Sequence, residues 1–460
     1  MRYVDFVLLA TEPRIVKAES KKRLVFSLLA PGTFDDSISC ELDIRALGDL
    51  KDKASNKEAD WNDAGRLGEA LAEVLLPQPV WNALNNRITQ AAADQEGVRV
   101  RLMLSGGELN NLPWEFIVFN RAGGERKASD FLALMPNLSL VRHRATPLAA
   151  WRVTAEVPAR VLVAVASPSK WPKLDVAAER SVVVNALAGC AQLTVDSVEH
   201  ARRNQLPQKM RPVHLFHFAG HGKFDEQQSP VPGAYEGKAS IMLEDEYGDE
   251  DPLDAELLAL QLRDAGVRVA VLGACLTAQR DDIGAWSSAA EALLKAELGA
   301  VVAMQFPVFD KSALCFAERF YEALSVGLSI DEAVTAGRVG IAALGDSRGW
   351  ATPVLYLRSP DGVIFPEFEA SPDLTNEREQ IRLSIHQKIG QLEGSAVALK
   401  IGQMEVSDAG KTMQDIGRAL SATQVGQEIG VVTKTGSAIG VEIGSVKQNR
   451  PRSNNSDEVC

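Results

Sequence analysis

The fold is decided by the stretch Val213-His214-Leu215-Phe216-His217-Phe218-Ala219-Gly220-His221-Gly222, read together with Val269-Ala270-Val271-Leu272-Gly273-Ala274-Cys275. Each is a short apolar run followed by small residues and then by one reactive side chain. Runs of this kind, bounded by glycine, are typical of buried parallel strands. A parallel sheet brings the residues just past its strand ends to one edge, where ligands bind. We therefore expect His221 and Cys275 to meet there, with a helix over Leu253–Ala265 as the crossover between their strands.

These two residue types suit nucleophilic catalysis. The thiolate of a cysteine is the nucleophile, and a neighbouring imidazole can take the thiol proton and later give it to a leaving amine. Gly222 has no Cβ, so its N–H can approach a substrate carbonyl and form an oxyanion hole with the N–H of Cys275. The alternative is that Cys275 is a small core residue and His221 a loop residue that caps a strand. A cysteine with a histidine about 50 residues upstream is the caspase-like order and favours the catalytic interpretation.

Further motifs make a resemblance specific. Val213–Gly222 and Val271–Ala278 resemble segments of the CHAT family, the caspase-like peptidases often found in bacterial multidomain proteins. Other stretches resemble the same family and occur in its order: Leu112-Pro113-Trp114-Glu115, Gly299-Ala300-Val301-Val302-Ala303-Met304, Pro307-Val308-Phe309-Asp310 and Gly349-Trp350-Ala351-Thr352-Pro353. The resemblance covers roughly residues 95 to 365.

The resemblance implies a caspase-like fold with His221 as the general base, Cys275 as the nucleophile and Gly222 as an oxyanion donor. Gln305-Phe306 departs from the family pattern, because many relatives carry a tryptophan before the proline, and this difference concerns a pocket wall. The Gln-Ala-Cys signature of caspases is also absent, since Gly273-Ala274 precedes the cysteine. A caspase-type preference for aspartate is therefore not expected.

The fold class follows from the order of the elements. Strands alternate with helices from Arg160 to Leu357, which predicts βαβ units and an α/β fold with a mainly parallel sheet flanked by helices. We expect three regions. Residues 1–150 form an N-terminal α+β region, which in relatives resembles an inactive caspase-like half, and residues 151–368 form the catalytic domain. Residues 371–460 form a C-terminal appendage with a helix over Glu377–Leu392.

The composition limits the classes of partner and location. A 46% hydrophobic and 24% charged sequence is ordinary for a soluble globular protein. A net charge of −12 argues against nucleic acid as a partner. Five cysteines without paired spacing indicate a reducing compartment. The sequence has no zinc-site spacing and no apolar run of the ~18 residues that a membrane span requires. We expect a cytoplasmic protein with neither a metal nor an organic cofactor.

Acidic residues could select the substrate. The segment from Lys223 to about Asp251 is interpreted as a loop that holds many carboxylates, among which Glu244 or Asp245 would pair with a basic substrate side chain. The alternative is that this loop is merely solvated. Asp310 would line the specificity pocket or cap the helix that follows it. A second polar loop, Thr277–Trp286, suits a mobile lid.

Two further segments each have two interpretations. Trp114-Glu115 could form a substrate-groove wall, but we favour packing of the tryptophan against the sheet, with Glu115 bound to an arginine. The tail over residues 395–447 holds short β-prone units that each end in glycine and that could pair between chains. The alternative for this segment is a weakly ordered tail.

The leading functional hypothesis is a CHAT-type cysteine endopeptidase that acts on a protein substrate as an effector in a bacterial defence or signalling system. Its activation would involve a partner protein or self-association through residues 395–447. A non-catalytic caspase-like scaffold that recruits partners through its tail is the main alternative. A thiol esterase or transferase would use the same His221–Cys275 dyad.

Overall fold

The structure is a computed structural model. It describes residues 2–18, 21–33, 37–54, 56, 59–120, 124–143, 158–228, 235–273, 275–276, 285–306, 309–363 and 374–392. For residues 18, 21, 224–228, 235–237, 275, 276, 285–288 and 291 it describes the backbone only.

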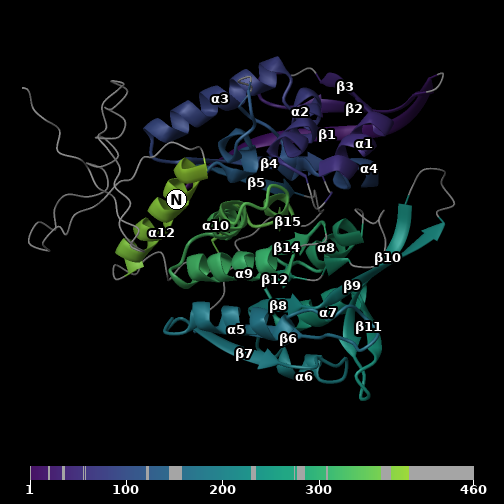
Figure 1. Cartoon of the computed structure of the whole chain (residues 1–460), viewed down its shortest axis with the longest axis vertical. Coiled ribbons are helices and arrows are strands. Elements are labelled where there is room, and N and C mark those ends of the chain that lie inside the picture. Colours follow the sequence, from purple (N-terminus) through teal and green to yellow (C-terminus); the bar gives the residue numbers. More distant parts are fainter. Residues whose placement is uncertain are drawn as a thin grey trace, which may run out of the picture. The chain divides into compact units, whose positions relative to one another are not determined.

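Strands and helices alternate through most of this chain (Figure 1). The strands are β1 (Tyr3–Ala18), β2 (Lys21–Leu29), β3 (Ile38–Asp43), β4 (Gly97–Leu104), β5 (Leu138–His143), β6 (Ala159–Val165), β7 (Leu193–Val198), β8 (Leu215–Ala219), β9 (His221–Gln228), β10 (Tyr235–Glu244), β11 (Glu250–Asp254), β12 (Val269–Leu272), β13 (Cys275–Leu276), β14 (Ala300–Met304) and β15 (Pro353–Leu357). The α-helices are α1 (Ile44–Ala54), α2 (Trp61–Leu75), α3 (Gln78–Ala93), α4 (Gly107–Asn110), α5 (Val176–Leu187), α6 (Leu206–Lys209), α7 (Ala255–Ala265), α8 (Ala285–Lys295), α9 (Asp310–Ser325), α10 (Ile330–Ala343) and α12 (Thr375–Leu392). Short 3-10 helices are η1 (Trp114–Phe116), η2 (Ala128–Asp130), η3 (Leu132–Leu134) and η4 (Gly349–Ala351).

The main sheet has eleven strands in the order β3-β2-β1-β4-β5-β15-β14-β12-β8-β6-β7. Strands β1, β4, β5 and β15 run parallel to one another. Strands β14, β12, β8, β6 and β7 form a second parallel block. The two blocks meet at β14 and β15, which are antiparallel. The predicted α/β fold class with a mainly parallel sheet flanked by helices is confirmed.

The central strands are apolar apart from a few residues such as His217, because both faces of the sheet are covered. In β6, Val161 and Val163 belong to one buried cluster, whereas Leu162 and Ala164 belong to another. Successive side chains of a strand point to opposite faces, so these clusters lie on the two faces of the sheet. Helices α5, α9 and α10 adjoin one another and contribute to the first cluster, and α6, α7 and α8 contribute to the second.

The helix α7 connects the two strands that decide the fold. It was expected to begin at Leu253, but Leu253 lies in β11 and the helix begins two residues later. Asp254 is its N-cap, and the Oδ1 atom of this residue accepts from the N–H of Glu256 at 2.8 Å. The helix ends at Ala265, and its C-cap is Gly266. The φ of Gly266, 83°, is a left-handed conformation that glycine adopts without strain. The crossover then enters β12 directly.

A second sheet, in the order β11-β10-β9-β13, extends from the carboxyl ends of β8 and β12. The prediction that Lys223 to Asp251 is a loop was wrong, because described residues 223–228 and 235–244 form β9 and β10. Ala239, Ile241 and Leu243 of β10 alternate into the buried cluster that α7 and α8 also line. The acidic residues are concentrated around the turn that follows β10. Their charge suggested a solvated loop, although the residues before the turn have the alternating pattern of a strand.

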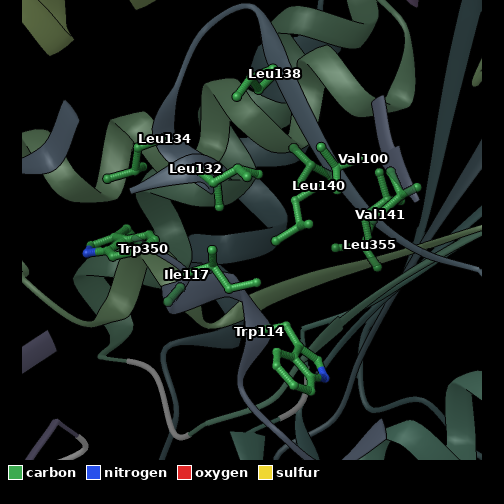
Figure 2. Packing of buried hydrophobic residues seen from close by; sticks show 14 of the residues in the cluster. Val100, Trp114, Ile117, Leu132, Leu134, Leu138, Leu140, Val141, Trp350 and Leu355 are labelled. Atoms are coloured by element: carbon green, nitrogen blue, oxygen red, sulfur yellow. The ribbon is translucent and has the colours of Figure 1, made fainter. Parts of the chain in front are cut away.

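Trp114 and Glu115 pack inside the molecule, and Figure 2 shows Trp114 among its buried neighbours. The Nε1–H of Trp114 donates to the carbonyl of Leu109 at 2.7 Å. The Glu115 carboxylate lies 2.5 Å from Nη2 of Arg142 and accepts from Nε2 of Gln305 at 2.8 Å. The favoured packing interpretation, with Glu115 bound to an arginine, is confirmed.

The chain divides into one compact unit over Met1–Glu393 and a second over Gly394–Cys460. Helix α12, predicted over Glu377–Leu392, packs on α10 within the first unit. The second unit lies outside the described residues, as do the predicted boundary near residue 150 and residues 277–284 of the expected lid.

Candidate functional site

The two residues that the sequence singled out begin neighbouring strands of the second sheet. Strand β8 ends at Ala219 and β9 begins at His221, whereas β12 ends at Leu272 and β13 begins at Cys275. Strands β9 and β13 pair in parallel with Cys275 directly opposite His221. The structure therefore brings the backbones of these two residues together at the carboxyl ends of two adjacent parallel strands, β8 and β12.

Two glycines allow this close approach. A Cβ on Gly220 would lie 2.8 Å from the carbonyl oxygen of Ala166. A Cβ on Gly273 would lie 2.7 Å from Oε1 of Glu179 and 3.1 Å from the carbonyl oxygen of Phe218, to which the Gly273 N–H donates at 2.8 Å. Only glycine fits where backbones come this close. The small residues before His221 and Cys275 are therefore requirements of packing.

The imidazole of His221 is buried, and the loop that follows β6 holds it. Its Nε2 atom lies 2.7 Å from the carbonyl oxygen of Pro172. A carbonyl only accepts hydrogen bonds, so Nε2 carries the proton and the neutral ring has an unprotonated Nδ1. The ring of Trp171 lies against the imidazole, with 5.1 Å between ring centroids. Burial lowers the pKa of His221, and the Pro172 carbonyl only partly opposes this effect.

A second histidine, His217 of strand β8, lies in a buried network. Its Nδ1 is 2.9 Å from the hydroxyl of Tyr321 and its Nε2 is 3.1 Å from Oε1 of Glu179. Burial raises the pKa of Tyr321 well above its ordinary value, so its hydroxyl keeps its proton and donates to Nδ1. The Nε2–H of His217 then donates to Glu179. This network fixes the Glu179 carboxylate beneath Gly273.

A small pocket that is partly open to solvent adjoins Gly273. Its lining combines apolar side chains with three carboxylates and consists of Leu174, Asp175, Val176, Glu179, Gly273, Asp310, Ala313 and Leu314. Asp310, predicted either to line a pocket or to cap a helix, lines this pocket as the first residue of α9, and Phe309 is the N-cap. Gly273, which lines the pocket, is two residues before Cys275 in the chain. The lining also makes the pocket strongly acidic.

The other predicted site residues have different surroundings. Glu244 is buried and accepts from the N–H of Ser167 at 2.7 Å, and its other oxygen is 2.7 Å from Nδ1 of His200. Asp245 accepts from two backbone N–H groups of its own turn. Gly222 lies within β9, opposite Ile241 on one side and Leu276 on the other.

The sequence reasoning did not identify Trp171, Pro172 or Glu179. The available signal was their position, because the loop that holds Trp171 and Pro172 follows β6, which neighbours β8 in the parallel block. Loops after adjacent parallel strands reach the same edge of a sheet. Within the described ranges, no helix is both long enough and apolar enough to cross a membrane. Among those same residues, no cluster of three or more His, Cys, Asp or Glu side chains could hold a metal ion.

Comparisons with known proteins give a family match and several structural similarities. The model of the CHAT domain family matches residues 65–356. The Arg-specific cysteine proteinase gingipain R aligns over 70% of this chain and 76% of its own, with 12% identity and a TM-score of 0.40. The separase–securin complex of Saccharomyces cerevisiae aligns over 56% of this chain and 15% of that chain, with 15% identity and a TM-score of 0.32. A search of curated protein sequences gave no match.

The family model spans more than half of the chain and includes both strands that lead to the site. The protein therefore belongs to the CHAT domain family, the caspase-like peptidase family that its sequence motifs resemble.

Proposed function

We propose that the protein is a cysteine endopeptidase in which Cys275 is the nucleophile and His221 the general base. The observation that carries this proposal is the in-register pairing of these residues at the ends of two adjacent parallel strands. Neighbouring strands lie about 4.8 Å apart. At that separation, a thiol and an imidazole that point to the same side can form a hydrogen bond.

The reaction follows from these groups. The Nδ1 atom of His221 takes the thiol proton, and the sulfur of Cys275 forms a bond to the scissile carbonyl carbon. The π electrons of the carbonyl move to its oxygen, where the N–H groups of Gly222 and Cys275 stabilise the negative charge. The imidazolium then gives its proton to the amine as the C–N bond breaks, which leaves a thioester. A water molecule, deprotonated by the same imidazole, hydrolyses this thioester and restores the thiol.

The surroundings of His221 support its role as the base. The Pro172 carbonyl fixes the tautomer in which Nδ1 carries no proton, and a general base needs such an unprotonated nitrogen. Burial, which lowers the pKa of His221, keeps the imidazole neutral near pH 7. A base must be unprotonated before the reaction starts, so both effects favour catalysis.

We propose that the acidic pocket selects a basic substrate side chain at the cleaved position. Asp310, Glu179 and Asp175 line it next to Gly273, and carboxylates form strong charge-assisted hydrogen bonds with arginine and lysine. Glu244 and Asp245, the other carboxylates considered for this role, are bonded to backbone N–H groups of the fold. Asp310 is therefore the main candidate for the specificity-determining residue.

We further propose that the cleavage serves a bacterial defence or signalling system, as the resemblance described above implies. An activating protein, or self-association through residues 395–447, would switch the enzyme on.

The proposal is tested by labelling and cleavage. A peptidyl electrophile with a basic residue at its reactive end should label the wild type and a Cys190→Ser control, because Cys190 is a half-buried cysteine outside the site. Cys275→Ala should abolish the labelling and lower turnover by about a million-fold, as removal of a serine-protease nucleophile does. Cleavage that persists in Cys275→Ala contradicts the mechanism. Turnover of small esters without protein cleavage would instead support an esterase or transferase.

A further inference from the structure

A turn of the second sheet holds the loop that contacts His221. The N–H of Ser169 donates to the carbonyl of Gly248 at 2.9 Å, and its hydroxyl donates to Oδ1 of Asp249 at 2.8 Å. Lys170 Nζ lies 3.1 Å from Oδ2 of Asp249. The indole N–H of Trp171 donates to the carboxylate of Glu250. Three consecutive residues of one loop are thus bonded to three consecutive residues of the turn.

The turn is well suited to hold a loop because it is itself fixed. Oδ1 of Asp245 accepts from the N–H groups of Tyr247 and Asp249, both at 2.8 Å. Just before the turn, Glu244 is buried and accepts from the N–H of Ser167, at the start of the same loop. The acidic residues Glu244, Asp249 and Glu250 therefore lie where the end of β10 and its turn meet the loop that follows β6.

Two residues of the loop contact the imidazole directly. Trp171, whose indole N–H is bonded to Glu250, lies against the ring of His221, and the carbonyl of Pro172 accepts from its Nε2–H. An exposed ion pair or hydrogen bond contributes little to folding stability. Several such contacts on one short loop can nevertheless fix its position, and catalysis is sensitive to displacements of about 1 Å.

We propose that Asp249 and Glu250 are positioning residues that act on His221 through Trp171 and Pro172. They hold the loop so that the indole excludes water from the imidazole and the carbonyl fixes its tautomer. This inference rests on the proposed function for its catalytic consequence, but the effect on the imidazole itself can be measured without any substrate.

The sign of a pKa change separates this indirect effect from direct electrostatics. The elements around His221 carry the titratable groups Lys170, Lys173, Asp175, Lys223, Lys238, Glu244, Asp249, Glu250 and Cys275. Removal of a nearby carboxylate acts through space to lower the pKa of a histidine. Release of the loop instead hydrates the ring, and hydration raises a pKa that burial had lowered. A loss of the tether should therefore move the pKa of His221 upward.

The first experiment measures the pKa of each histidine by NMR in protein with labelled histidine. The chain has six histidines, and the signal of His221 is identified by its loss in His221→Gln. Glu250→Ala and Asp249→Ala should each raise the pKa of His221, and Trp171→Ala should raise it further. Glu246→Gln, which removes an exposed charge from the same turn, should not raise it. An unchanged or lowered pKa in Glu250→Ala and Asp249→Ala overturns the inference.

The second experiment is a double-mutant cycle on cleavage. Trp171→Phe keeps an aromatic ring but removes the N–H that Glu250 accepts. Glu250→Ala alone should lower kcat/KM by about tenfold, equivalent to ~1.4 kcal/mol, mainly through kcat, and should move the acid limb of the pH profile upward. In the Trp171→Phe background, the same substitution should have almost no further effect. Fully additive losses contradict an action through the indole.

The two proposals fail differently. If Cys275→Ala retains cleavage, the catalytic assignment is wrong. The NMR measurement of the pKa of His221 still tests the positioning role, because it does not depend on cleavage. If cleavage depends on Cys275 but Glu250→Ala leaves both the pKa of His221 and the pH profile unchanged, only the positioning role is wrong. Equal thermal unfolding temperatures of the variants serve as the control for folding.

Discussion

Glu115→Ala should be among the most destabilising single substitutions in this protein. The carboxylate is fully buried, and it accepts from Nη2 of Arg142 at 2.5 Å and from Nε of Arg142 at 3.1 Å. It also accepts from Nε2 of Gln305 at 2.8 Å. Removal of the carboxylate leaves the guanidinium charge inside the protein with only neutral acceptors, among them the carbonyls of Asn110 and Leu112.

The magnitude follows from that geometry. Hydrogen bonds to charged groups contribute about 1.5–3 kcal/mol each, and removal of one partner of a buried ion pair typically costs about 3–5 kcal/mol. We expect the free energy of unfolding to fall within that range for Glu115→Ala. Burial alone would lower the pKa of Arg142, but the carboxylate of Glu115 raises it, which agrees with a pair that is charged in the folded state.

The assay is urea-induced unfolding followed by tryptophan fluorescence, with Glu41→Ala as the matched control. Glu41 lies 2.7 Å from Nη1 of Arg23, but the two side chains are 52% and 43% exposed. An exposed pair of this kind contributes less than about 1 kcal/mol. Equal losses for the two variants would refute the reasoning. The double variant Glu115→Leu/Arg142→Met should regain most of the stability, because it removes both buried charges together.

Three further outcomes are expected. Gly273→Ala should abolish labelling of Cys275, because the added Cβ would lie 2.7 Å from Oε1 of Glu179, whereas Gly48→Ala, in helix α1 with open space around the added Cβ, should retain it; full labelling of Gly273→Ala contradicts the packing argument. Because burial lowers the pKa of His221, the imidazole stays neutral below the ordinary value of 6.5, and kcat/KM should fall only as the pH drops through the lowered pKa; a pH–rate profile with its acid limb at or above 6.5 excludes this. Asp310→Asn should reduce cleavage after arginine and lysine by about tenfold relative to neutral residues in a peptide library, and an unchanged preference excludes Asp310 as the selecting residue.

The central elements could be predicted from the sequence because their pattern is local. Strand β14 is the apolar part of the motif Gly299-Ala300-Val301-Val302-Ala303-Met304, and helix α10 lies in the region where alternating strands and helices were predicted. The helix begins where Ser329 and Glu332 form a capping box, a signal that lies within four residues of the sequence. Glycine after a buried run likewise marked the ends of β8 and β12.

The parts that the sequence did not predict depend on distant partners. Strand β13 is described over Cys275–Leu276, and these residues form a strand because β9, more than fifty residues earlier, pairs with them. No local pattern near Trp171 or Pro172 indicates that they contact His221, because the bond between Pro172 and His221 joins a loop to the start of β9 across 49 residues. Glu179 was concealed in an ordinary helix, and only the folded chain places its carboxylate beneath Gly273.

Because β14 and β15 are antiparallel, the strands of the two parallel blocks end at opposite rims of the main sheet. In a parallel block all strands finish at the same rim, so β8, β12 and β14 finish on the side of the candidate site. Strands β1, β4 and β5 share the direction of β15, which is opposite, and so they finish at the far rim. The N-terminal half therefore presents the starts of its strands, and not their carboxyl ends, on the side of the candidate site. We infer that this half acts as a scaffold for the site that the other half forms.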